Sequence, residues 1–283
     1  MTVTNAVETT MIWGTVSGAS MVGMVISLLL SVVLPIFLGI FIYKKTKAWV
    51  PAFFIGCGIF VGFAMILEQI CHAIVLTVTG SAIRDNIWLY AIYGGLAAAL
   101  FEECGRWIAM TFCLKKHLTR ENALMYGAGH GGIEAFLILG MSSMSNLLTA
   151  AMINGGLMEK TMTALEPAQQ EVTYHQLSVL WTTPAYQFYL APVERISAIA
   201  LQIALSILVY SAVKTGRKLH LAAAFGLHFA VDFLTVICAS TNSYMGIGAG
   251  IAAGGCSDLC SGIQAGLSVA SREKSLTETE ACR

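Results

Sequence analysis

Residues 101–107 read FEECGRW and lie inside a long apolar stretch, with IWLYAIYGGLAAAL before them and IAMTFCL after them. About 20 apolar residues are enough to cross the hydrocarbon core of a bilayer. Two carboxylates and an arginine are costly at such a depth, and residues of this kind face the interior of a helix bundle rather than lipid. The stretch therefore predicts a membrane-spanning helix with one polar face turned towards other helices.

The composition of the whole chain supports this prediction. Hydrophobic residues make up 57% of the 283 residues and charged residues only 11%, whereas soluble domains carry about 25% charged residues. We expect one integral-membrane domain over residues 1–283, all-α and multi-pass, with the lipid bilayer as its surroundings (the plasma membrane if the source is a bacterium). The formal net charge is zero and no large basic block is present, which argues against a nucleic-acid partner.

Hydropathy predicts about seven spans. Their expected ranges are 20–43, 49–79, 87–113, 122–144, 193–213, 219–240 and 243–270, and the fourth can continue past Met144. The last span is rich in glycine, which suits close packing against another helix. The more polar segment near 159–192 is expected to be an extracytoplasmic loop, with room for a short interfacial helix at its aromatic end.

The basic residues indicate the orientation. Twelve of the 16 lysines and arginines fall in the connections after spans one, three, five and seven: Lys44, Lys45, Lys47, Lys115, Lys116, Arg120, Lys214, Arg217, Lys218, Arg272, Lys274 and Arg283. Positive residues concentrate in short cytoplasmic loops. The expected N-terminus is therefore outside and the C-terminus cytoplasmic.

Ionisable residues of three expected spans fall at one depth. At a rise of about 1.5 Å per residue, Glu102, His130 and His228 lie roughly 18, 12 and 13 Å from the cytoplasmic ends of their spans. Each has a polar companion four residues away, on the same helix face; these pairs are Glu102 with Arg106, His130 with Glu134, and His228 with Asp232. The helices near 87–113, 122–144 and 219–240 are thus the candidate catalytic helices.

These residue types are suited to activating water. Glu103 is expected to pair mainly with Arg106, because they are three residues apart on one helix. Glu102 then stays free to act as general base. Four glycines around His130, in GAGHGG at 127–132, would allow a neighbouring backbone or a peptide to approach it closely.

Two roles are open for the histidines. In a metal-free mechanism His130 and His228 position the water or donate to the developing oxyanion, with Glu134 and Asp232 orienting them. Alternatively, His130, His228 and Glu102 form a three-ligand Zn²⁺ site that keeps one position for water. The residues alone do not decide between these two mechanisms.

The motifs EECGR, GAGHGGIEA and HFAVD, in this order, resemble those of YhfC-type membrane peptidases. These are similar in turn to the CAAX prenyl protease and bacteriocin-processing superfamily of glutamate-dependent intramembrane proteases. The resemblance implies that Glu102 is the catalytic glutamate, and it favours the metal-free mechanism. It also implies roles for the companions Glu103 and Arg106, for His130, and for His228 with Asp232. The shorter spacing of EECGR and the added Glu134 favour the YhfC branch over true prenyl proteases.

The function expected from these observations is an intramembrane protease that cleaves a peptide bond in or near a membrane segment of a peptide or protein. A proton-coupled transporter is an alternative, because carboxylates and histidines also build proton relays, and a silent membrane scaffold is another. Two further polar pairs are expected to lie at the outer membrane interface: Glu68 with His72, and Glu194 with Arg195.

Overall fold

A computed structural model describes residues 11–240, and every regular element in that range is helical. Six of the helices, counted among these residues, are long and apolar enough to cross a membrane. They cover Gly18–Thr46, Pro51–Thr79, Ile87–Cys113, Arg120–Asn154, Ala185–Thr215 and Lys218–Ser240. The chain is therefore an integral, multi-pass membrane protein, as expected. The seventh predicted span, 243–270, lies outside the described residues.

Several of these spans change their helix type along their length. The first span is α1 (Gly18–Thr46), and the second runs through α2 (Pro51–Phe60), η1 (Val61–Glu68) and α3 (Gln69–Thr79). The third joins α4 (Ile87–Ile108) to η2 (Ala109–Cys113) and is followed by the short η3 (Lys115–His117). The fourth joins α5 (Arg120–Ala135), η4 (Phe136–Gly140) and α6 (Met141–Asn154). The segments η1, η2 and η4 are π-helical.

The segment expected as a loop near 159–192 is largely helical instead. It contains α7 (Leu157–Met162) and α8 (Pro167–Thr182), and then α9 (Ala185–Thr215) begins before the expected fifth span. The last described helix, α10, covers Lys218–Ser240. The fifth span begins at Ala185, earlier than the predicted residue 193. In the structure Pro192 lies inside α9.

Local sequence signals set many of the helix ends. Ser17, Asn86 and Thr119 accept hydrogen bonds from backbone N–H groups of the first turns of α1, α4 and α5, which satisfies donors that have no partner within the helix. Pro51 occupies the first turn of α2, where its missing N–H costs nothing. Gly216, with a φ of 71°, follows the last residue of α9.

The outward surface of α1 shows how the bundle meets lipid. Its buried positions include small residues, Gly23, Ser27 and Ser31, whereas large apolar side chains are exposed. These are Val22, Val25, Ile26, Leu29, Val32, Val33, Ile36, Phe37, Ile40 and Phe41. This pattern is typical of membrane helices, which pack through small residues and present large apolar ones to the acyl chains.

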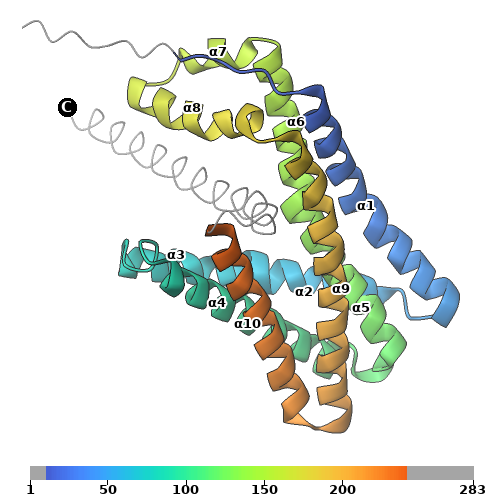
Figure 1. The fold of residues 1–283 in the computed structure, drawn as a ribbon. Coiled ribbons are helices and arrows are strands. Elements are labelled where there is room, and N and C mark those ends of the chain that lie inside the picture. The colour runs from blue at the N-terminus through green and yellow to red at the C-terminus, as the bar shows by residue number, and fades with distance from the viewer. Residues whose placement is uncertain (1–10, 241–283) are drawn as a thin grey trace, which may run out of the picture.

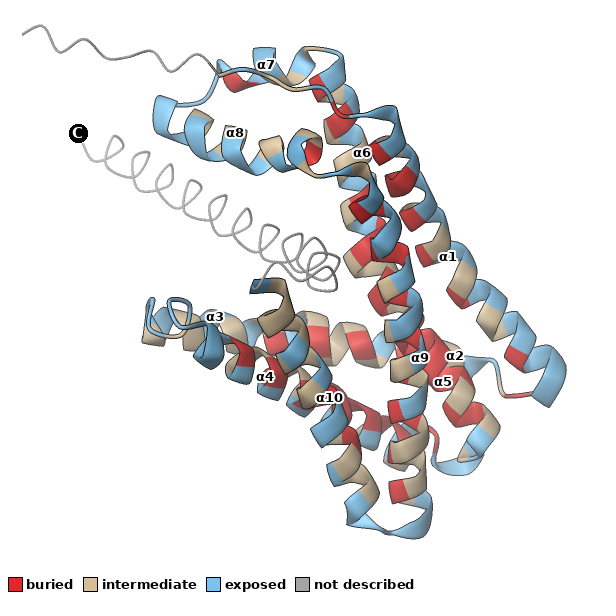
Figure 2. Cartoon of the chain, viewed as in Figure 1, coloured by how far each residue is buried: buried red, intermediate tan, exposed pale blue. Residues whose placement is uncertain are grey.

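The centre of the bundle is α5, which packs against α1, α2 and α9. A Cβ atom on Gly129 would lie 1.9 Å from the carbonyl oxygen of Phe53 in α2, and one on Gly56 would lie 2.2 Å from the carbonyl oxygen of Tyr126 in α5. The two helices can approach this closely only because both positions are glycine. Buried residues gather where α2, α5 and α9 meet (Figure 2).

The remaining helices extend from this centre in two groups. In one, α1 lies along α6 and α9, and in the other α10 lies on α4, which also packs on η1 (Figure 1). The second span runs obliquely to α1 in this arrangement (Figure 1). Position along that span is therefore a poor measure of depth in the membrane.

Candidate active site

The three side chains predicted to meet at the centre of the site lie together. Nε2 of His130, from α5, is 2.8 Å from Oε2 of Glu102, from α4. Nε2 of His228, from α10, is 3.9 Å from Oε1 of the same carboxylate. All three side chains are buried. One carboxylate thus stands between two imidazoles on three different helices.

Arg106 contacts both adjacent glutamates. Its guanidinium donates to Oε1 of Glu103 and, over 3.2 Å, to Oε2 of Glu102. The sequence predicted pairing mainly with Glu103 and a free Glu102. In the structure Glu102 also belongs to the ion pair, since the fully buried guanidinium reaches both carboxylates from one turn further along α4.

Glu103 holds the imidazole of His228. Nδ1 of His228 lies 2.7 Å from Oε1 of Glu103. A carboxylate can only accept here, so Nδ1 carries a proton, and Nε2 on the other side of the ring faces Oε1 of Glu102. Asp232, expected to orient this histidine, lies 3.5 Å from the same Nε2. The proton on Nδ1 is therefore set by Glu103 rather than by Asp232.

Gln202, in α9, links Glu102 and Arg106 of α4 to Glu134 of α5. It was not predicted from the sequence. Its amide nitrogen donates to Oε2 of Glu102 over 3.1 Å and to Oε2 of Glu134 over 2.6 Å, and its oxygen accepts from Arg106. An uncharged side chain in an apolar span gives little signal. One clue was present, because Gln202 follows Arg195 by seven residues, two helical turns along the same face.

Arg195 also belongs to this network. It donates to Oε1 of Glu134 over 3.2 Å and pairs with Glu194. The expected position at the outer interface is wrong for Arg195, whose side chain is buried. The reason is that α9 begins at Ala185, which places Arg195 about 15 Å into the helix.

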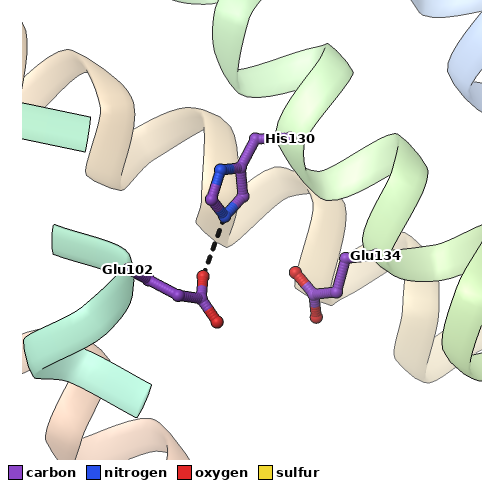
Figure 3. Close-up of side chains that lie close together, drawn as sticks. All are labelled: Glu102, His130 and Glu134. Atoms are coloured by element: carbon purple, nitrogen blue, oxygen red, sulfur yellow. Dashed lines mark hydrogen bonds and ion pairs between the residues drawn. The ribbon is translucent and has the colours of Figure 1, made fainter. Parts of the chain in front are cut away.

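Glu134 points into the same space as Glu102 and His130 (Figure 3). Its hydrogen-bonding partners are Gln202 and Arg195, not a histidine. One ligand atom from each of Glu102, His130 and Glu134 lies within 4.8 Å of the other two. The sequence predicted that Glu134 orients a histidine; in the structure it is instead held by Gln202 and Arg195 and lies beside Glu102 and His130.

These donors fit a divalent transition metal. Imidazole nitrogens and carboxylate oxygens are ordinary Zn²⁺ ligands, and the structure brings one such set together: Glu102, His130 and Glu134. The sequence predicted a second set, with His228 in place of Glu134. A histidine that binds a metal usually donates its second N–H to a carboxylate, and Glu103 stands in that position for His228.

Comparisons with known proteins agree with the geometry. The family model described as YhfC intramembrane metalloprotease matches residues 30–252. The chain is 41% identical over 222 residues to the uncharacterized membrane protein YhfC of Bacillus subtilis strain 168, an alignment that covers 75% of this chain and 83% of that protein. No solved structure matches. On the family match and this identity, the chain belongs to the YhfC intramembrane metalloprotease family.

Proposed function

We propose that the protein is a zinc-dependent intramembrane protease that hydrolyses a peptide bond in or near a membrane segment of its substrate. The observation that carries the proposal is the pair of buried imidazoles, which direct their Nε2 atoms at the same carboxylate of Glu102. His130, His228 and Glu102 would hold the metal. A bound Zn²⁺ supplies an acidified water and polarises a carbonyl.

Glu134 is the proposed general base. Its two oxygens are held by Gln202 and Arg195, which point the carboxylate at the space shared with Glu102 and His130. From there it takes a proton from the attacking water and returns it to the amine that leaves. Gln202 and Arg195 keep the carboxylate oriented, so they are positioning residues.

A metal-free mechanism uses Glu102 itself as the base. The position of its carboxylate between two imidazoles favours this second candidate. However, Oε2 of Glu102 already accepts from Arg106 and Gln202 and contacts His130. Only Oε1 remains to take a proton from water. The transporter alternative gains no support from the family match.

Metal analysis of the purified protein, coupled to cleavage of membrane-segment peptides with and without a chelator, tests the proposal. We expect about one zinc per chain and cleavage that the chelator abolishes. His130→Ala and His228→Ala should lose both metal and cleavage, and Glu102→Gln should lose cleavage. Activity in a metal-free preparation would reject the zinc mechanism and favour Glu102 as base.

Glu134→Gln separates the two ligand sets. If Glu134 is the base, the variant keeps the zinc and loses cleavage by about a hundredfold or more. If it loses the metal instead, Glu134 is a ligand and the role of base must be reassigned. His175→Ala is the matched control, because His175 is exposed on α8; it should change neither metal content nor cleavage.

A further inference from the structure

A second line of hydrogen-bonding side chains leads away from the site, and the proposed mechanism does not use it. His72, in α3, lies at its middle. Its Nε2 is 3.2 Å from Oε1 of Glu68, and its Nδ1 is 2.7 Å from the hydroxyl of Tyr93 in α4. The imidazole therefore joins a carboxylate to a phenol through its two ring nitrogens.

The carboxylate end of this line faces the site. Glu68 is buried and interacts electrostatically with Glu102 and His228. Asp232 also interacts with Glu68. No direct hydrogen bond joins Glu68 to these residues within 11–240, but η1, which ends at Glu68, packs on α4, the helix that carries Glu102. Water between Glu68 and the site would complete the connection.

The other end lies much closer to the end of the bundle. At about 1.5 Å per residue, Glu102 is about 22 Å from the start of α4 at Ile87, whereas Tyr93 is only about 9 Å from it. On the neighbouring span, Glu68 is about 16 Å and His72 about 10 Å from the last residue of α3. Measured along the two helix axes, Glu68, His72 and Tyr93 thus lie between the level of Glu102 and the connection from α3 to α4.

The surroundings of Tyr93 are typical of a membrane–water interface. Trp88 and Tyr90 are exposed on the first turns of α4, and tryptophan and tyrosine concentrate at the level of the lipid headgroups. The side chain of His72 is 24% exposed, against 9% for Glu68. Exposure therefore rises from Glu68 to His72 along this line.

The opposite direction is closed by packing. Between the site and the connection after η2, the buried core contains Ala109, Met110, Leu114 and Met125, each at most 1% exposed. Apolar side chains at this density leave little room for a chain of water molecules.

We propose that Glu68, His72 and Tyr93 form a proton path that connects the buried site to the membrane interface at the start of α4. The inference rests on the proposed hydrolysis. Cleavage of a peptide bond by water gives a carboxylic acid and a neutral amine. The acid releases its O–H proton before it leaves as a carboxylate, and the amine takes up a proton from water only after it has left the buried site. The path carries that one proton out.

The transfer balances at every step. A water between the site and Glu68 passes the proton to the carboxylate of Glu68, which gives it to Nε2 of His72. Nδ1 of His72 releases its own proton to the oxygen of Tyr93, and the hydroxyl proton of Tyr93 passes to interfacial water. Reorientation of the imidazole and the hydroxyl then restores the starting state. Cys71 and Tyr90 also interact electrostatically with Tyr93.

Steady-state kinetics of His72 variants in detergent or liposomes test the path. For His72→Ala we expect kcat to fall by about tenfold, with KM and zinc content unchanged, since His72 contacts no substrate and no proposed ligand. Imidazole added to the buffer should restore most of the lost kcat, because it replaces the missing proton carrier. Tyr93→Phe should show a smaller loss.

His220→Ala is the matched control, since His220 also bonds a hydroxyl, that of Ser211 over 3.0 Å, but lies away from the site at the start of α10. It should leave kcat unchanged with or without imidazole. His72→Gln keeps a hydrogen-bonding side chain and serves if the alanine variant fails to fold. A kcat within twofold of the unaltered protein, or a loss that imidazole does not restore, would overturn the path.

Failure of the path and failure of the proposed function give different results. If the unaltered protein cleaves peptides and Glu102→Gln does not, the function stands and the His72 variants alone decide the path. If the unaltered protein cleaves no membrane-segment peptide, both proposals are rejected.

Discussion

The amide of Gln202 does two things that no other side chain at the site does together. Its nitrogen donates to the carboxylates of Glu102 and Glu134, and its oxygen accepts from the guanidinium of Arg106. A donor shared by two acids holds them side by side in spite of their repulsion. At the residue scale the site therefore depends on an uncharged group as much as on its acids and imidazoles.

Gln202→Leu tests this role. The substitution keeps the volume but leaves two buried carboxylates and a guanidinium short of a partner, at a cost of about 1–3 kcal/mol or more for charged groups. We expect a lower unfolding temperature in detergent and strongly reduced cleavage. Gln187→Leu is the control on the same helix, because Gln187 is also buried but lies well before the site. Equal effects of the two substitutions would contradict a special role for Gln202.

At the scale of the elements, the site depends on how closely α5 approaches α2. The contact of Gly129 with the backbone of Phe53 and that of Gly56 with Tyr126 bring His130 into register with Glu102. Three of the spans also contain a π-helical segment: η1 ends at Glu68, η2 follows Arg106 and η4 follows Glu134. Such wide turns are frequent at functional sites.

Gly129→Ala should separate the two helices. The added methyl would overlap a carbonyl oxygen of α2, which cannot rotate away as a side chain could, so we expect a loss of about 1–3 kcal/mol in stability together with weaker metal binding. In Gly58→Ala the new methyl meets nothing within 4 Å. That variant should be neutral or up to about 1 kcal/mol more stable. Thermal unfolding and zinc content measure both, and a stable, metal-replete Gly129→Ala would contradict the close contact.

At the scale of the whole molecule, the orientation of the chain decides on which side of the membrane the proposed proton path ends. The basic connection after η2, with Lys115 and Lys116, is predicted to be cytoplasmic, and the connection 80–86 is predicted to lie outside. The proposed proton path ends near the second of these. Protons released by cleavage would then leave on the outer side.

Labelling of single cysteines in a cysteine-free background tests the orientation. A membrane-impermeant maleimide should label Ser81→Cys in intact cells, and it should label Lys116→Cys only after the cells are permeabilised. The positive-inside distribution is the physical reason. The reverse pattern would invert the assigned orientation and place the end of the proton path in the cytoplasm, while labelling at both positions in intact cells would indicate mixed insertion.

The sequence by itself determined the class of the protein and the core of the candidate site. Apolar runs of membrane length predicted the spans up to 240, because the cost of burying backbone and charge in lipid is local to each segment. Spacing of four residues placed Glu102 with Arg106 and His228 with Asp232 on shared helix faces, and both contacts are present. The predicted start of the fifth span at 193 put Arg195 at the interface, whereas α9 begins at Ala185.

Only the tertiary structure decided which polar groups act together. Gln202 is uncharged and gives no hydropathy signal, and it joins the site through contacts between helices. Hydropathy measures one segment at a time, whereas tilt, helix pairing and the sharing of a donor between two acids arise from packing between segments. Depth along a helix equals depth in the membrane only for an upright helix.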